Sequence, residues 1–314
     1  MTKAITITKK EPINGEDKNI YLDPRLARFF FCIVKVSIIW EYCFESADKG
    51  ETLDNFTNTN KNRRYKAHVN IFGTTQLHLK SPYIVAFWSV VFPGFGHLLL
   101  SKYIRGMLLF LWELFINQIT HLNSAMVYSF MGDIESAKAV LDVKMMHLYI
   151  PVYIFAIWDS YRSTVDLNKI YLLAERENAP FNTFSIGALE INYLDKKNPL
   201  LAFLCSLTIP SVGQLYINRF VLGFFNLVMT VIIVYYSHFL EAFHYLLLGN
   251  ISKSTSVLNA QWLLYLPSFY FFTIYDSYTN AVENNKLFEQ EQKNYLKKNY
   301  QPSGFMIMKG NKVK

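Results

Sequence analysis

Long apolar blocks alternate with shorter polar ones along the chain, and the blocks form two sets of three. Segment a covers residues 83–100 and 200–216, segment b covers 106–131 and 223–248, and segment c covers 145–165 and 262–282. Segments b and c are long enough to cross a bilayer, since about 20 helical residues span its hydrocarbon layer. The pattern predicts an all-α integral membrane protein.

The two sets repeat one another with a constant offset of 117 residues, so that residues 82–170 align with 199–287 without a gap. Within segment a, the turn motif Pro93, Gly94 and Gly96 falls over Pro210, Ser211 and Gly213. Other identical pairs are Gly106/Gly223, His121/His238, Gly132/Gly249, Asp159/Asp276 and Asn168/Asn285. Self-similarity at a fixed offset predicts a tandem repeat.

Segment a has two interpretations. It could cross the membrane, which would invert the second copy, or it could dip in and return, which would give both copies one orientation. Residues 83–92 would form a half-helix of about 15 Å, half the hydrocarbon thickness. Pro93 then removes a backbone donor and Gly94 allows a sharp turn. These features favour re-entrant turns at Pro93 and Pro210.

The positions of lysine and arginine separate the two interpretations. With segment a re-entrant and the N-terminal region inside, the inner segments hold all but three of the 31 Lys and Arg. The outer loops then hold Lys138, Lys144 and Lys253. If segment a crossed, the positive residues between Arg162 and Lys197 would move outside as well. Positive residues prefer the cytoplasmic side, so we predict re-entrant segments and cytoplasmic N- and C-terminal regions in the cell membrane.

The remaining segments complete the predicted organisation. It comprises an inner N-terminal region 1–80, membrane repeats 81–177 and 199–295, a linker 178–198 and a basic tail 296–314. Residues 27–44 are apolar with interior charges, so a span and an interfacial element both stay open. Residues 69–79 alternate in part and predict a short hairpin. The helical pattern of segment c continues through 162–177 and 281–295.

Composition supports the membrane class. The chain is 52% hydrophobic and 17% aromatic, and its apolar residues gather in longer runs than a soluble core needs. Its net charge of +7 comes from residues that flank the apolar segments, which suits anionic lipid head groups rather than nucleic acid. Cys32, Cys43 and Cys205 have neither metal-site nor disulfide-framework spacing.

The turn motif belongs to a wider pattern: Pro-Gly-x-Gly-His/Gln, an aromatic residue, a downstream Gly and a later Trp/Tyr-Asp. It is carried by Pro93, Gly94, Gly96, His97, Tyr103, Gly106, Trp158 and Asp159, and again by Pro210, Gly213, Gln214, Tyr216, Gly223, Tyr275 and Asp276. Over both repeats, the chain resembles TM2-like bacterial membrane domains and uncharacterised membrane proteins with a PGxGQ-x-Y signature. It departs from them in a longer connection between segments b and c and in lacking their Asp-Arg-Phe turn. The resemblance implies a multi-span architecture and no established enzyme activity.

Charged residues near the inner end of segment c predict two ion pairs. Asp159 and Asp276 each lie in an Asp-Ser-Tyr sequence, and Lys102 and Arg219 follow segment a. A carboxylate at the membrane border is costly unless it is paired. We therefore expect Asp159 to pair with Lys102 and Asp276 with Arg219, clamping segment c to the re-entrant turn. A proton or ion relay is the alternative.

Polar residues along segment b form a second set of candidates. They are Glu113, Asn117 and His121 in the first copy and His238, Glu241 and His244 in the second. A Glu-x-x-His pair on one helical face is a di-iron element in bundles, but such a site needs carboxylates from other helices. Hydrogen bonding between helices is the simpler interpretation, so we predict no metal and no cofactor.

These features predict a non-enzymatic membrane scaffold, or a subunit of a membrane complex, that contacts the lipid bilayer and a homo-oligomer or membrane-protein partner. No phosphate loop, activated nucleophile or paired acidic motif in the sequence indicates an enzyme. The alternative is a small-solute channel or transporter, which requires a polar cavity joining the segment b residues to the Pro-Gly turns. A scaffold instead predicts a closed core and an apolar lateral face.

Overall fold

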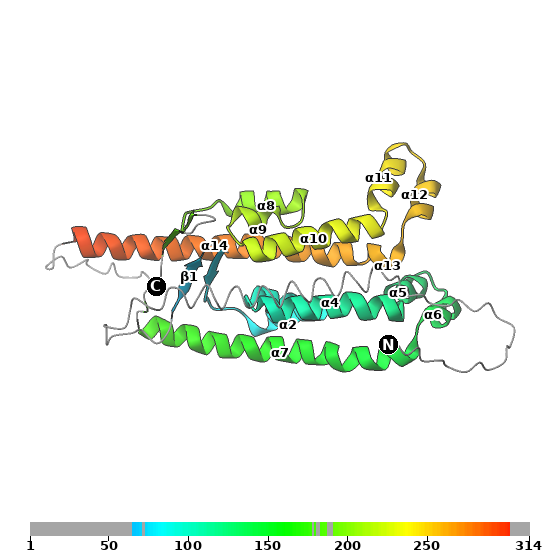
Figure 1. The fold of residues 1–314 in the computed structure, drawn as a ribbon, viewed down its shortest axis with the longest axis horizontal. Helices are drawn as coiled ribbons and strands as arrows, with labels where there is room; N and C mark the ends of the chain where they lie inside the picture. The colour runs from blue at the N-terminus through cyan, green and yellow to red at the C-terminus, as the bar shows by residue number, and fades with distance from the viewer. Residues whose placement is uncertain (1–64, 71–72, 178, 180–182, 187–190, 302–314) are drawn as a thin grey trace, which may run out of the picture. The chain divides into compact units, whose positions relative to one another are not determined.

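The computed structural model describes residues 65–70, 73–177, 179, 183–186 and 191–301, which all belong to one compact unit, residues 60–314. This unit is predominantly helical and contains two short hairpins (Figure 1). The prediction of a mainly helical chain is therefore confirmed. The expectations for the N-terminal region before residue 65, including 27–44, and for the tail beyond residue 301 lie outside the described residues.

The elements form two series in the same order. The first contains β1 (Ala67–Asn70), β2 (Gly73–Gln76), α2 (Pro82–Val91), α3 (Phe95–Leu99), α4 (Tyr103–Thr120), α5 (Leu122–Phe130), α6 (Ile134–Val140) and α7 (Val143–Arg176). The second contains β3 (Phe184–Ile186), β4 (Ile191–Tyr193), α8 (Pro199–Thr208), α9 (Val212–Tyr216), α10 (Phe220–Tyr236), α11 (Phe239–Leu247), α12 (Ile251–Val257), α13 (Ala260–Leu263) and α14 (Tyr265–Tyr300). Together α13 and α14 correspond to α7.

The two series also agree in backbone detail. Helices α2 and α8 both have 10 residues and begin at a proline, whose fixed φ suits the first helical turn. Positive φ values occur at Ser101, His121 and Gly132 in the first series. They recur at the counterparts Asn218, His238 and Gly249 in the second.

Each series opens with an antiparallel hairpin. In β1–β2, Ala67 faces Gln76, and in β3–β4 their counterparts Phe184 and Tyr193 face each other. The first hairpin agrees with the alternation seen in 69–79. The second lies within 178–198, where the sequence pattern predicts a linker. The prediction missed this hairpin because strands this short give too little alternation to stand out from a loop.

Segment b is not one continuous helix, contrary to what its apolar length predicts. Helices α4 and α5 meet at His121, with φ of 53°, and α10 and α11 meet at His238, with φ of 54°. A left-handed residue cannot continue a right-handed helix, so the helix ends there and restarts in a new direction. The two histidines are junction residues and do not lie along an unbroken helical face.

Within the described residues, no individual helix combines the length and apolar composition of a membrane span. Two bent pairs of helices do so jointly: α6 with α7, at 85°, and α10 with α11, at 61°.

The helices of each series follow the same course (Figure 1). Helices α4 and α10 run away from the hairpins, and α7 and α14 run back towards them. Helices α7 and α14 extend to Arg176 and Tyr300, which confirms the helical continuation of segment c. The shorter α2 and α8 stop at the Pro-Gly and Pro-Ser turns, after which α3 and α9 fold back against them.

Aromatic side chains fill the contact between the two series. Phe95, in the first turn, stacks on Phe272 of α14 with ring centroids 4.0 Å apart. Trp88 lies 5.2 Å from Tyr275, and Phe110 lies 5.3 Å from Phe225, measured between ring centroids. Aromatic pairs at these distances add stability beyond simple burial. The first turn is therefore a packing centre for both series.

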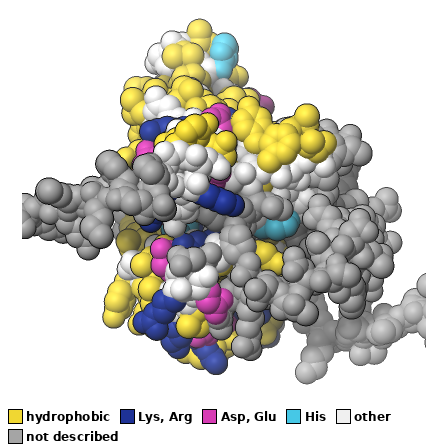
Figure 2. Space-filling view, turned by 90° about the vertical axis from the view of Figure 1, so that its left-hand side faces the viewer, with side chains coloured by type: hydrophobic (Ala, Val, Ile, Leu, Met, Phe, Trp, Pro, Cys, Tyr) yellow, Lys and Arg dark blue, Asp and Glu magenta, His cyan; other side chains and the backbone are white. Residues whose placement is uncertain are grey.

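Charged side chains gather at the end of the unit where α7 and α14 finish, in the face shown in Figure 2. Basic and acidic groups mingle there, and hydrophobic side chains occupy the margins. Lys66 pairs with Glu175 at 2.8 Å, and Lys196 pairs with Glu289 at 2.9 Å. Charged side chains thus gather where the two long helices end.

Candidate functional site

A buried polar cluster surrounds the second turn. Arg219 Nη1 lies 2.6 Å from Asp276 Oδ1, so the expected ion pair between these residues is present, and both side chains are almost fully buried. Gln214 Nε2 also donates to Asp276 Oδ2 at 2.8 Å. Asn226 Nδ2 donates to Gln214 Oε1 at 2.7 Å. The carboxylate therefore joins α14 to both α9 and α10.

The same cluster reaches into the first series. Arg219 Nη2 donates to Tyr103 Oη at 3.2 Å, and its guanidinium carbon lies 5.9 Å from the centre of the Tyr103 ring. One residue thus satisfies a carboxylate in its own series and contacts the start of α4 in the other. Arginine suits this role because its planar fork offers several donors in fixed directions.

The counterpart cluster at the first turn is arranged differently from the predicted pair. Asp159 Oδ2 lies 2.7 Å from Arg105 Nη1 and 2.8 Å from His97 Nε2. Lys102 instead donates to Ser163 at 2.7 Å. The expectation that Lys102 pairs with Asp159 was wrong. Ser163, one helical turn beyond Asp159, accepts a hydrogen bond from the Lys102 ammonium group. Arg105 approaches the Asp159 carboxylate from the exposed side.

Close packing at the two turns depends on glycine. A Cβ on Gly96 would meet Val85 O at 2.7 Å, and a Cβ on Gly213 would meet Ser277 Cβ at 3.0 Å. Each glycine also lies against a serine of the preceding half-helix, Ser89 or Ser206. Gly94, with φ of 102°, opens the first turn, whereas Ser211, with φ of 92°, opens the second. Pro93 and Pro210 precede these two residues.

The polar residues of segment b separate into two groups. Asn117 and Glu113 are buried near α13, where Gln261 Nε2 donates to Asn117 Oδ1 at 2.8 Å. Asn123 Nδ2 donates to the Gln261 carbonyl, also at 2.8 Å. Tyr149 Oη donates to Glu113 Oε1 at 3.3 Å. This hydrogen-bonded group forms a second polar link between the two series.

The remaining segment b candidates lie near the surface. His238 Nδ1 is 3.4 Å from Glu241 Oε2, and both side chains are at least half exposed. His244 is exposed on α11, and His121 forms the junction of α4 with α5. In the described part of the chain, no group of three or more His, Cys, Asp and Glu residues could hold a metal ion.

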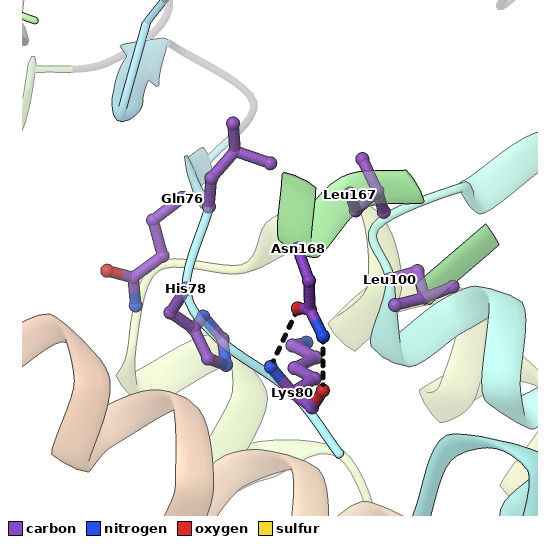
Figure 3. A pocket seen from close by; sticks show the side chains of 7 residues that line it. Gln76, His78, Lys80, Leu100, Leu167 and Asn168 are labelled. Carbon is purple, nitrogen blue, oxygen red and sulfur yellow. Dashed lines mark hydrogen bonds between the residues drawn. The ribbon is translucent and has the colours of Figure 1, made fainter. Parts of the chain in front are cut away.

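A small pocket lies where the first hairpin leads into α2 (Figure 3). It is lined by Gln76, Leu77, His78, Lys80, Leu100, Leu167 and Asn168. Asn168 accepts from the Lys80 backbone N–H at 3.1 Å and donates to the Lys80 carbonyl at 2.8 Å. Asn285 makes the same pair of bonds to Lys197, at 2.9 and 2.7 Å. These asparagines fix the connections that enter α2 and α8.

We expect the stability of the fold to rise with pH through the titration of Lys80. Burial first, and the nearby positive charge of Arg219 second, lower the pKa of Lys80 from 10.5 to about 7. Between these values the unfolded chain keeps the proton and the folded chain does not, so raising the pH favours folding. Below the lower value both states are protonated, and this dependence disappears.

Thermal melts of the purified protein from about pH 7 to about pH 10 would measure this effect. Lys80→Met should flatten the rise in Tm. Lys169→Met is the matched control, because Lys169 is an exposed lysine on α7. If both variants keep the wild-type rise, Lys80 is not its source.

Several structural residues were missed by the sequence analysis. Gln261, Arg105 and Lys80 belong to no recognisable motif, so the sequence did not single them out. The Asn168/Asn285 identity was visible, and extending the alignment upstream to Lys80 and Lys197 would have suggested an equivalent contact in both series.

Comparison with known proteins adds no assignment: no protein-family model, curated protein or solved structure matches this chain.

Proposed function

We propose that this chain is a multi-pass membrane protein built from two tandem repeats. Each repeat combines a re-entrant half-helix with bent and long helices. The observation that carries the proposal is the distribution of polarity. Arg219, Asp276, Gln214 and Asn117 are buried, whereas large apolar side chains face outward. The outward-facing residues include Ile84, Phe87, Leu204, Leu207, Phe224, Val228, Val231, Leu240 and Leu247. Where such residues form a contiguous apolar surface, that surface marks a protein or membrane contact.

The matching series support the repeat and the re-entrant segments. Helices α2 and α8 have 10 residues each, and at about 1.5 Å per residue each covers half a hydrocarbon layer. Non-helical backbone at that depth needs a protein cover, and Phe95, Gly96 and Gly213 are buried at the turns. Both repeats then share one orientation, with cytoplasmic N- and C-terminal regions. The resemblance to TM2-like domains stays a prediction.

The same geometry favours a scaffold or a complex subunit over a catalyst. The polar residues of the interior bond mainly to one another: Arg219 joins the series through Tyr103, and Gln261 joins them through Asn117. Such pairing holds helices together where exposed polar groups would be costly. The role we propose is therefore a non-enzymatic component of the cell membrane.

A small-solute channel or transporter is less well supported. Its polar candidates do not converge, because Glu113 and Asn117 are buried beside Gln261 whereas Glu241 and His244 are exposed on α11. Glu113 Oε2 is a buried oxygen without a hydrogen-bond partner among the described residues, and it is the atom a pathway would use. Liposomes containing the purified protein should therefore leak no faster than empty ones. A leak abolished by Glu113→Gln would favour the channel.

Membrane insertion predicts a specific fractionation and labelling result. The protein should stay in the membrane pellet after alkaline carbonate washing and dissolve in detergent. In a cysteine-free background, Lys138→Cys and Lys253→Cys should react with an impermeant thiol reagent from outside, and Lys102→Cys should react only after the membrane is opened. Release by carbonate would contradict membrane insertion, and outside labelling of position 102 would contradict the re-entrant turn.

A further inference from the structure

The two series meet through different faces. The first series contributes the half-helix and turn residues Trp88, Phe92 and Phe95, and the second contributes Tyr265 and Phe272 from the N-terminal third of α14. Phe92 and Tyr265 have ring centroids 5.9 Å apart, and Trp88 and Phe272 have centroids 5.6 Å apart. We call the half-helix and turn of a series its front face. The contact is head to tail, because the front face of the first series covers the long helix of the second.

The first hairpin continues this contact along α14. Ala67 packs with Leu287 in one buried cluster, and Gln76 Nε2 donates to Asn284 Oδ1 at 2.7 Å. Thr74 N donates to the Asn218 carbonyl at 3.2 Å, between α9 and α10. The front face of the first series thus includes its hairpin as well as its turn.

The face of α7 that corresponds to the covered face of α14 is exposed. Leu148, Phe155 and Ile170 are 51%, 49% and 40% exposed. Their counterparts on α14, Tyr265, Phe272 and Leu287, are 3%, 0% and 8% exposed. Within the described part of the chain, the long helix of the first series therefore presents the same kind of apolar face without the cover that α14 receives.

The front face of the second series is open as well. Phe184 and Ile186 of β3 are 53% and 73% exposed, whereas their counterparts Ala67 and Val69 are 4% and 2% exposed. Ile209, the counterpart of the buried Phe92, is 50% exposed. Lys196, which follows β4, pairs with Glu289 of α14, so the β3–β4 hairpin lies with the charged helix ends and lipid would not explain the apolar residues on it. Among the residues that the structure describes, the front face of the second series and the α7 face of the first thus have no partner within the chain.

We propose that the open front face of one copy, β3–β4 with α8, docks on the open face of α7 in a second copy of this chain. This contact between two molecules would be equivalent to the contact between the two series within one molecule. Head-to-tail contacts of this type close into rings or continue as filaments. The inference rests on the two-repeat architecture proposed above, and it names the partner of that architecture as the chain itself.

The native Cys205 makes this docking testable. Cys205 is the counterpart of Trp88, whose ring centroid lies 5.6 Å from that of Phe272, the counterpart of Phe155. In full-length protein with Cys32→Ser and Cys43→Ser, Phe155→Cys should give a ladder that begins with a species of doubled mass when membranes are treated with a short bifunctional thiol reagent. Adding Cys205→Ser should remove most of that species.

Ile154→Cys is the matched control. Ile154 neighbours Phe155 and is 59% exposed, and its counterpart Phe271 stays 67% exposed beside the internal contact. Position 154 should therefore give little cross-linking to Cys205. Equal yields at 154 and 155, or no doubled-mass species at 155, would overturn the docking. So would a monomeric mass for the unmodified protein extracted in lipid nanodiscs, a measurement that needs no variant.

A third arm tests whether residues of the same chain cover α7. When Cys32 and Cys43 are kept and Cys205 is replaced by serine, a cross-link within one chain from position 155 to either cysteine would assign the face to the N-terminal region and overturn the proposal. The carbonate wash remains a separate test. Doubled-mass species from a chain released by carbonate would reject membrane insertion alone, and a carbonate-resistant chain without them would reject the docking alone.

Discussion

Replacing Asp276 with alanine should cost about 3–5 kcal/mol of unfolding free energy, because it leaves the buried Arg219 without its counter-charge. Arg219 and Asp276 have 3% and 0% exposed side chains, and both carboxylate oxygens contact the guanidinium, at 2.6 and 2.7 Å. Water cannot compensate for the lost partner at such a site. Reversible unfolding in mixed micelles, followed by helical circular dichroism, would measure the loss.

Asp159→Ala is the matched control for this prediction. Asp159 occupies the equivalent position, but its ionic partner Arg105 is 53% exposed and keeps its hydration when the carboxylate is removed. We expect a smaller loss of about 1–3 kcal/mol, because the buried His97, whose Nε2 lies 2.8 Å from the carboxylate, loses its hydrogen-bond partner while Arg105 stays solvated. The double variant Arg219→Met/Asp276→Ala should recover part of the large loss, since it removes the stranded charge. Equal losses for Asp276→Ala and Asp159→Ala would contradict the assignment of a buried ion pair to the second turn alone.

Replacing Gly213 with alanine should destabilise the fold by about 1–3 kcal/mol through overpacking. The added Cβ would run into Ser206 Oγ and the Ala202 carbonyl, and it would lie 3.0 Å from Ser277 Cβ. A backbone carbonyl cannot turn aside as a flexible side chain can, so α9 would have to move away from α8. The midpoint of unfolding in the same micelle assay should fall accordingly.

Gly249→Ala provides the comparison. Gly249 has φ of +75°, and a Cβ added there meets nothing within 4 Å. The alanine would carry only the cost of left-handed backbone, about 1 kcal/mol. Gly213 has the opposite character, with ordinary helical backbone and no room. If Gly213→Ala is as stable as the wild type, the turn does not pack as tightly as the structure indicates.

Local patterns were sufficient for the elements that depend on local chemistry. The prolines and glycines of segment a correctly placed the breaks at Pro93 and Pro210, because proline and glycine restrict or free the backbone at their own positions. The helical continuation of segment c followed from periodicity. The same patterns failed at His121 and His238, since the left-handed junction there has no proline or glycine to announce it.

Contacts between distant residues were predictable only where charge limited the choices. Arg219 and Asp276 could be paired because a buried charge needs an opposite one nearby. The same reasoning gave the wrong partner for Asp159, because Lys102 and Arg105 are one helical turn apart and either could reach the middle of α7, where Asp159 lies. Side-chain direction decides between them, and it depends on how α4 packs.

The sequence by itself determined which segments of the two series correspond, the turn positions at Pro93 and Pro210 and the pairing of Arg219 with Asp276, because each follows from covalent geometry, periodicity or the cost of burying a charge. Only the tertiary structure decided which face of each series is covered. Counterparts such as Phe155 and Phe272 have the same side chain, yet one is 49% exposed and the other is 0% exposed. Burial belongs to the surroundings of a residue, and two identical residues can acquire different surroundings when one series packs head to tail on the other.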